Sequence, residues 1–311
     1  MDKKLIIITG PTAAGKTEIS IRTALRIGGE IVSADSMQVY RSMDIGSAKV
    51  KKEEMRKVRH HLIDILDPKE EFNVYLFKKL AGEAVEGIYE RGNIPIIAGG
   101  TGFYIQALLY DVDFEENKGD DSYRKELSEL ALSKGPAFLH KLLKEVDPDY
   151  ANEVHENNVK RVIRALEFYR ESGQMLSEHN RIQRQKLSEY DFKYYVINME
   201  RELLYKRIDQ RVDKMMDMGL LDEVRYLKDR GIPRDSTAMQ GIGYKELYSY
   251  LMGETELAEA VEAIKKNSRH YAKRQITWFK RERDVIFLNK EDYDFDDERI
   301  AKHISESVQK G

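Results

Sequence analysis

Cysteine is absent from the 311-residue chain, which excludes disulfide bonds, thiolate zinc sites, iron–sulfur ligation and cysteine nucleophiles. Proline is scarce, with 6 residues, and no proline-rich or glycine-rich linker interrupts the sequence. No apolar run approaches the roughly 18 residues of a membrane-spanning helix, and the run at 5–8 is too short for the core of a secretory signal. We therefore expect a cytoplasmic protein that makes no membrane contact.

An excess of one charge is also lacking, because 52 Lys and Arg face 55 Asp and Glu and leave a net charge of −3. Taken alone, this value argues against a polyanionic partner. The charges are nevertheless segregated along the chain. Residues 291–298 carry six acids, whereas residues 265–283 carry one acid against eight cations: Lys265, Lys266, Arg269, Lys273, Arg274, Lys280, Arg281 and Arg283. Drawn as a helix, the basic segment predicts either a grip on phosphates or a solvated face.

Hydrophobic periodicity predicts strands that alternate with helices in the first third of the chain. Short apolar runs at 5–9, 31–34, 62–66 and 94–98 indicate strands, and helical spacing follows at 15–27, 74–91 and 101–109. Residues 111–190 show charged helical segments without a convincing strand. Strand character returns at 193–197 and 284–288, with helices expected at 201–230 and 254–280. This pattern predicts an α/β core with a parallel sheet from 1–110 and 191–311, and an all-helical insert at 111–190.

The most specific motif is GPTAAGKT, which satisfies G-x-x-x-x-G-K-[ST] between a predicted strand and a predicted helix. Its glycines let backbone N–H groups converge on phosphate oxygens, Lys16 adds a positive charge, and the Thr17 hydroxyl can ligate Mg²⁺. The motif predicts a P-loop NTPase-like sheet and a site for a di- or triphosphate formed by Gly10, Pro11, Thr12, Ala13, Ala14, Gly15, Lys16 and Thr17.

The acid expected near a P-loop is in an unusual place. The strand at 94–98 ends in Gly99-Gly100-Thr101 without a carboxylate, whereas the strand at 31–34 ends in Asp35. If this strand adjoins the P-loop strand, Asp35 points into the crevice where open α/β sheets bind ligands. Asp35 is then a candidate general base or outer-shell partner of a metal; the alternative is a cap of the turn at Ser36.

Several segments together resemble the tRNA dimethylallyltransferases, which transfer an isopentenyl group from dimethylallyl diphosphate to tRNA. The similar blocks appear in the family's order from residue 10 to about 281: GPTAAGKT, SADSMQVY, MDIGSAK, GGTGFY, RVIRALEFY, GIGYKE and AKRQITWFKR. The resemblance implies transfer to N6 of adenosine 37, the base 3′ of the anticodon. It assigns catalysis to Asp35 as general base and to Thr17, Lys16 and Arg211 on the departing diphosphate, with Mg²⁺ as cofactor.

The same resemblance implies contacts with the tRNA anticodon stem-loop, whose target base is expected to be flipped into a pocket. The implied RNA-contacting residues are Asp35, Ser36, Met37, Gln38, Thr101, Arg124, Val159, Lys160, Arg161, Val162, Ile163, Arg164, Gly241, Gly243, Tyr244 and Lys245. The shared face of the predicted basic helix adds Arg269, Lys273 and Lys280 as phosphate contacts. The sequence departs from the family's usual pattern at one position in the insert. Lys160 precedes Arg161 where the family commonly has glutamine, so the hydrogen bond of that amide to RNA is not expected here.

Alternative functions remain open from the residues alone. A P-loop small-molecule kinase would use the same fold, with Asp35 again as base; a prenyltransferase of free adenine nucleotides would leave the basic segments without a purpose. A noncatalytic RNA-binding module would make Asp35 dispensable. The basic segment, the missing carboxylate after 94–98 and the long insert favour the tRNA enzyme, which we expect to act as a monomer. The seven histidines show no metal-binding spacing.

Overall fold

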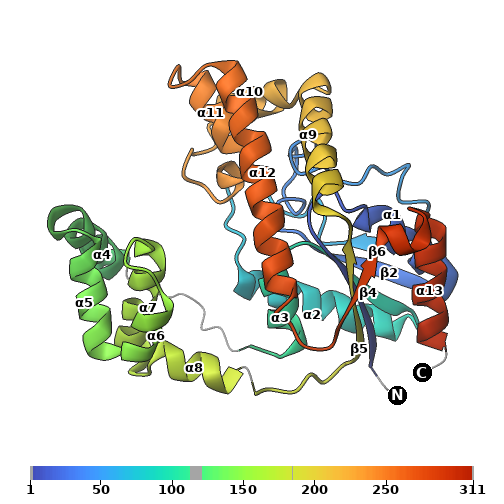
Figure 1. The fold of residues 1–311 in the computed structure, drawn as a ribbon, viewed down its shortest axis with the longest axis horizontal. Coiled ribbons are helices and arrows are strands. Elements are labelled where there is room, and N and C mark those ends of the chain that lie inside the picture. The colour runs from blue at the N-terminus through green and yellow to red at the C-terminus, as the bar shows by residue number, and fades with distance from the viewer. Residues whose placement is uncertain (1–2, 113–120, 184, 310–311) are drawn as a thin grey trace. The chain divides into compact units, whose positions relative to one another are not determined.

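The computed structural model describes residues 3–112, 121–183 and 185–309 (Figure 1). The chain divides into two compact units. The first combines Met1–Leu109 with Glu189–Gly311, and the second is Tyr110–Ser188. Among the described residues, no helix is long and apolar enough to cross a membrane.

The first unit is built on a six-stranded sheet whose strand pairs are all parallel, in the order β3-β2-β4-β1-β5-β6. The apolar runs form its centre because these strands are covered on both faces. In register, Ile8 of β1 lies beside Ala98 of β4 and Tyr195 of β5. The strands are β1 (Lys4–Thr9), β2 (Gly29–Ala34), β3 (His60–His61), β4 (Ile94–Gly99), β5 (Asp191–Asn198) and β6 (Val285–Asn289).

Helices cover this sheet, with α1 packed against α13 and α12 packed against α9 (Figure 1). Buried aliphatic side chains of the strands and of α1, α9 and α13 form one core cluster. The helices are α1 (Lys16–Ile27), α2 (Val74–Glu90), α3 (Gly102–Leu109), α9 (Arg201–Asp217), α10 (Leu220–Asp229), α11 (Tyr244–Leu251), α12 (Leu257–Phe279) and α13 (Asp297–Gln309), with short 3-10 helices η1 (Ala238–Gln240) and η2 (Lys290–Tyr293).

Two predicted elements were wrong. The strand expected at 62–66 is absent from these described residues, and β3 is instead His60–His61. Leu62 and Asp64 have φ angles of 62° and 57°, and this left-handed backbone is incompatible with a strand. The single helix expected at 201–230 is two helices, because Gly219 takes φ 96° between α9 and α10.

The second unit contains only helices among its described residues. Its core joins buried side chains of α4, α5, α6 and α7, including Leu127, Leu139, Leu143 and Val162. Pro136 and Pro148 begin two of the helices, where a missing N–H costs no hydrogen bond. The helices are α4 (Asp121–Lys134), α5 (Pro136–Val146), α6 (Pro148–Glu153), α7 (Val159–Ser172) and α8 (Leu176–Gln183).

Candidate active site

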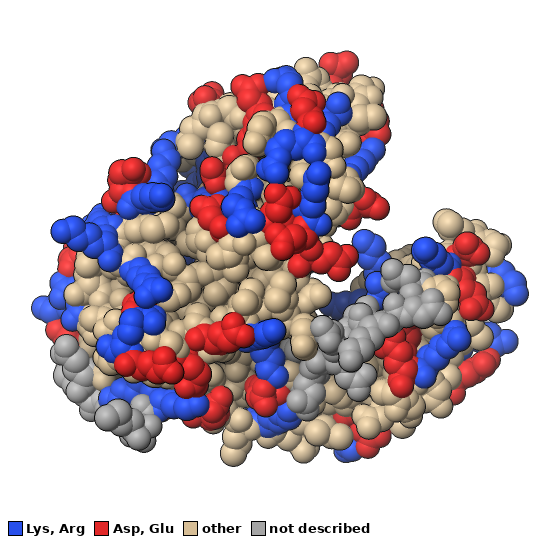
Figure 2. All heavy atoms as spheres, turned by 180° about the vertical axis from the view of Figure 1, so that it is seen from behind, with Lys and Arg blue, Asp and Glu red and all other residues tan. Residues whose placement is uncertain are grey.

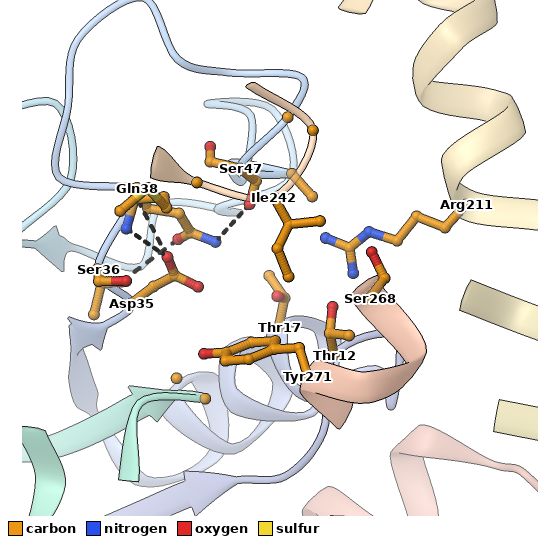
Figure 3. Close-up of a pocket in the computed structure, with 18 of the residues that line it drawn as sticks. Thr12, Thr17, Asp35, Ser36, Gln38, Ser47, Arg211, Ile242, Ser268 and Tyr271 are labelled. Carbon is orange, nitrogen blue, oxygen red and sulfur yellow. Dashed lines mark hydrogen bonds between the residues drawn. The ribbon is translucent and has the colours of Figure 1, made fainter. Parts of the chain in front are cut away.

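A cavity of about 510 Å³ lies at the carboxyl edge of the sheet, within the first unit. Its wall combines the P-loop, the ends of β2 and β4, the 46–50 loop, α9, residues 237–245 and α12. Figure 3 shows Asp35, Ser36 and Gln38 on one side of this space and Arg211 on the other. Thr12, Thr17 and Tyr271 lie between them. Segments distant in sequence therefore enclose one volume that is large enough for a small-molecule ligand.

The P-loop follows β1 and leads directly into α1. Gly15 is the N-cap of α1 with φ 88°, a left-handed conformation that favours glycine. A Cβ at this position would also stand 2.6 Å from the Nζ atom of Lys290. Thr17 is exposed to the cavity at the first turn of α1, where unpaired backbone N–H groups attract anions. This geometry fits a phosphate group.

Two cations face the cavity from different elements. Lys16 donates from Nζ to the Pro11 carbonyl oxygen at 2.8 Å. Burial, with the nearby positive charge of Arg211, lowers the pKa of Lys16 to about 7, although Asp35 opposes this shift. Burial likewise lowers the pKa of Arg211, which still remains charged because a guanidinium titrates far above neutrality. The two like charges repel each other in the empty cavity, and a bound anion would offset this repulsion, so the pair forms an anion site.

Asp35 stands at the end of β2 in a tight turn. Its Oδ1 atom accepts hydrogen bonds from the backbone N–H groups of Met37 at 2.8 Å and Gln38 at 3.3 Å. The predicted turn cap is therefore present, and the Oδ2 atom is not used by these two bonds. The Asp35 charge acts across the cavity, since it contributes, after burial, to raising the pKa of Tyr271 to about 12.

The strand order corrects one expectation about Asp35. β4 lies between β2 and the P-loop strand β1, so the Asp35 strand does not adjoin the P-loop strand. β4 ends at Gly99, Gly100 follows it, and both residues line the cavity. A Cβ atom at Gly99 would stand 2.3 Å from the Ala34 carbonyl oxygen, and one at Gly100 would stand 2.2 Å from the Gln275 Nε2 atom. Glycine at these two positions therefore permits the close approach of β2 and of the Gln275 side chain.

Gln275 on α12 is a site residue that the sequence analysis missed. Its Oε1 atom accepts a hydrogen bond from the Thr12 backbone N–H at 2.9 Å, and its Nε2 atom donates to the Gly100 carbonyl oxygen at 2.8 Å. The side chain is buried and bridges the P-loop to the end of β4. Arg207 adds a second brace, since its Nε atom donates to the Ala13 carbonyl oxygen at 3.2 Å. Only tertiary structure reveals these contacts.

We expect Gln275→Met to raise KM for the diphosphate substrate about tenfold, because two buried hydrogen bonds that shape the P-loop are lost at similar side-chain volume. Steady-state kinetics would measure this. Thr277→Val, an exposed change on the same helix, is the matched control and should leave KM within about twofold. An unchanged KM in Gln275→Met would refute a role for this bridge in the diphosphate site.

The basic segment forms the C-terminal half of α12 and the residues that follow it. Lys273, Arg274 and Lys280 are exposed, and Arg274 also lines the cavity. Two of the predicted cations are engaged by α9: Arg269 pairs with Asp209 at 2.5 Å, and Lys265 pairs with Asp213 at 2.7 Å. Lys and Arg alternate with Asp and Glu over the face in Figure 2. The exposed basic surface is therefore smaller than the sequence count indicates.

Three of the residues predicted to contact RNA have buried side chains. Val162 and Ile163 belong to the core of the second unit, and Tyr244 is fully buried in the first. The Tyr244 hydroxyl donates to Glu223 at 2.7 Å. Arg124 pairs with Glu167 at 2.8 Å. The three side chains are thus packed within the protein, and RNA contact by these residues stays a prediction.

The other residues assigned to RNA fall into distinct places. On α7, Lys160, Arg161 and Arg164 are exposed while Val159 is half-buried. Gly241, Gly243 and half-buried Lys245 line the cavity, as do Ser36, Met37 and Gln38. Thr101 starts α3: its carbonyl oxygen accepts hydrogen bonds from the N–H groups of Tyr104 and Ile105.

The described residues contain no group of three or more His, Asp or Glu side chains arranged to hold a metal ion. The cavity does offer oxygen atoms, from the Thr17 hydroxyl and the Asp35 carboxylate. Mg²⁺ needs few protein ligands when substrate phosphates and water complete its octahedron. These residues fit a Mg²⁺ ion that enters with a diphosphate.

Comparison with known proteins identifies the family. The IPP transferase family profile matches residues 38–282. A tRNA dimethylallyltransferase from Lachnoclostridium phytofermentans is 56% identical over 292 residues, covering 94% of this chain and 93% of that protein. The crystal structure of the full-length tRNA isopentenylpyrophosphate transferase from Bacillus halodurans has a TM-score of 0.74 at 44% identity, covering 99% of this chain and 97% of that one.

A second solved structure, the tRNA delta(2)-isopentenylpyrophosphate transferase from Staphylococcus epidermidis, has a TM-score of 0.73 at 45% identity and covers 99% of both chains. A eukaryotic dimethylallyltransferase acting on tRNA has a TM-score of 0.77 at 31% identity, covering 92% of this chain and 73% of that one. Since the matches extend over both units and over the cavity, the chain belongs to the IPP transferase family.

Proposed function

We propose that this protein transfers the dimethylallyl group of dimethylallyl diphosphate to N6 of adenosine 37 in tRNA and releases diphosphate. The observation that carries the proposal is one cavity with an anion site, Lys16 and Arg211, opposite a carboxylate, Asp35. A prenyl diphosphate placed between them has its leaving group at the cations and its allylic carbon toward the carboxylate. Membership of the family and the names of its relatives support the same reaction.

Different residues act on the departing diphosphate and on the attacking adenine. The adenine N6 attacks the allylic carbon, the carbon–oxygen bond to the diphosphate breaks, and the electron pair leaves with that oxygen. Lys16 and Arg211 stabilise the negative charge of the departing diphosphate. The N6 nitrogen loses one proton as the new bond forms, and Asp35 accepts it.

The P-loop backbone, Gly10–Thr17, holds the diphosphate, and its position after a parallel strand supports a P-loop NTPase-like architecture for the first unit. Thr17 would hold Mg²⁺, which would supply additional charge neutralisation on the diphosphate oxygens. Ser36, Met37 and Gln38, with the backbone of 241–243, form the wall for the flipped adenine.

The exposed cations on α7 and α12 grip the phosphates of the anticodon stem-loop. These are Lys160, Arg161, Arg164, Lys273 and Lys280, while Arg269 acts only if its pair with Asp209 opens. We propose that the enzyme acts as a monomer, since residues of a single chain line the whole cavity. We also propose that it acts in the cytoplasm.

The test supplies the enzyme with labelled dimethylallyl diphosphate, Mg²⁺ and either unmodified tRNA or AMP. We expect label in tRNA at adenosine 37 and none in AMP. Label in AMP alone would replace the proposal with transfer to free nucleotides. Phosphorylation of a small molecule from ATP would replace it with a kinase, and RNA binding without transfer would show a noncatalytic module.

We expect the double substitution Lys273→Ala with Lys280→Ala to weaken tRNA binding about tenfold or more and to reduce the salt slope of log Kd by about two. Both side chains are exposed on or beside α12, and neither lines the cavity, so affinity for the diphosphate should not change. Filter binding from 50 to 200 mM salt would measure the slope. Lys52→Ala with Lys302→Ala, two exposed lysines outside α12, should preserve it. An unchanged slope would mean that this face is only solvated.

A further inference from the structure

Glu223 on α10 holds the backbone of the loop at 43–49. Its Oε2 atom accepts hydrogen bonds from the N–H groups of Asp44 and Ile45, both at 2.8 Å, and its Oε1 atom accepts from Gly46 at 3.0 Å. The Tyr244 hydroxyl donates to Oε1 at 2.7 Å. We infer that Glu223 is a positioning residue that sets the adenine-binding wall of the cavity through this loop, an inference that rests on the proposed function.

A carboxylate suits this position because three consecutive N–H groups converge on it. Only an acceptor can satisfy all of them, and bonds to an ionised acceptor are stronger than bonds between neutral groups. Tyr244 also stabilises the position of the Glu223 carboxylate through its hydroxyl hydrogen bond. Burial and the Glu223 charge raise the pKa of the Tyr244 hydroxyl well above its ordinary value, so the hydroxyl stays protonated and donates.

The loop is also fixed by shape. Gly46 lies against the ring of Tyr244, where a Cβ atom would stand 2.6 Å from two ring carbons. At the far end of the loop, the buried Lys49 ammonium donates to the Tyr40 carbonyl oxygen at 2.7 Å and to Asp44 at 2.6 Å. The backbone between Asp44 and Lys49 is therefore held at both ends, by the Glu223 carboxylate at the Asp44 end and by the Lys49 ammonium at the other.

The loop is part of the cavity wall next to the proposed base. Gly46, Ser47 and Ala48 line the cavity, and the Ser47 carbonyl oxygen accepts a hydrogen bond from the Gln38 side-chain amide at 3.5 Å (Figure 3). Gln38 in turn donates its backbone N–H to Asp35. A shift of the loop would therefore misplace the Gln38 amide, which lines the cavity, while leaving the P-loop cations in place.

The experiment measures both substrates with Glu223→Gln in the full-length protein. The glutamine NH₂ group would oppose a backbone N–H, so the loop is expected to move. We expect kcat/KM for tRNA to fall about tenfold to a hundredfold, with KM for dimethylallyl diphosphate within about twofold of the wild type. Asp222→Asn, the exposed neighbour that pairs with Arg225, is the matched control and should keep both values.

Tyr244→Phe removes the bond to Glu223 and the contact of the hydroxyl with the Ser47 backbone, and it keeps the three amide bonds to Glu223. We expect it to lower kcat/KM for tRNA by about twofold to fivefold. If Glu223→Gln does not fold, Tyr244→Phe tests the inference through the same two measurements, kcat/KM for tRNA and KM for dimethylallyl diphosphate. An unchanged kcat/KM for tRNA, or an equal rise in KM for both substrates, would overturn the inference. Absence of prenyl transfer by the wild-type enzyme would overturn the proposed function. In that case, faster hydrogen exchange of the backbone amides at 43–49 in Glu223→Gln than in the wild type would still show that Glu223 holds this loop.

Discussion

Asp35→Asn is expected to lower kcat by about 10²- to 10⁴-fold while tRNA affinity stays within about twofold. The asparagine Oδ1 atom can still accept the backbone N–H groups of Met37 and Gln38, so the turn that shapes the base-binding wall is retained. The asparagine amide cannot accept the proton that adenine N6 must lose. Single-turnover rates at saturating substrate, together with filter binding of tRNA, would measure the two effects.

Two further variants separate the base from the turn. Asp35→Ala loses both functions of the carboxylate, so its tRNA affinity should also fall. Asp235→Asn, an exposed Asp outside the cavity, should preserve turnover and binding. Near-normal turnover of Asp35→Asn would remove Asp35 as general base and leave the turn as its only role.

The central strands could be predicted because local sequence alone specifies them. The runs at 5–9, 31–34 and 94–98 are continuous and apolar between turn residues, as strands buried on both faces require, and they correspond to β1, β2 and β4. The run at 62–66 has a similar composition but follows a strand of only two residues. Its Leu62 is buried by tertiary packing in a left-handed turn, a state that periodicity cannot distinguish from a strand.

The order of the strands was not predictable from the same pattern. Nothing in the run at 94–98 indicates that β4 inserts between β1 and β2. In the sequence, the glycines at its end indicate only that a carboxylate is lacking there. Their structural effect, the close approach of the Ala34 backbone and the Gln275 side chain, depends on that insertion.

The site residues that the sequence missed act through distant partners. Gln275 contacts Thr12 across 263 residues, and Glu223 contacts Asp44 across 179 residues. Their residue types occur commonly on exposed helix faces, so neither carries a local signal. The same limit applies to charge: eight cations can be counted in 265–283, but the acids on α9 that neutralise Lys265 and Arg269 become visible only in the fold.

Lys16→Met is expected to lower kcat/KM for dimethylallyl diphosphate by about 10²- to 10³-fold, because a charge aimed at the departing diphosphate is removed. The wild type should also show a proton-linked affinity. Burial, and then the Arg211 charge, lowers the pKa of Lys16 to about 7, so Lys16 in the empty site is largely neutral at pH 8.5. A bound diphosphate favours the ammonium and raises this pKa. Binding must therefore take up a proton, and affinity must fall as pH rises above 7.

Calorimetry at pH 8.5 in two buffers of different ionisation enthalpy, with a thiolo-diphosphate analogue as ligand, would measure an uptake approaching one proton in the wild type. Lys302→Met should keep this uptake and Lys16→Met should abolish it. In the ligand-free protein, the unfolded chain binds more protons than the folded one between pH 7 and the ordinary lysine pKa of about 10.4, so the Lys16 contribution to the free energy of unfolding rises with pH in that window. Uptake that persists in Lys16→Met would assign the titrating group elsewhere in the cavity.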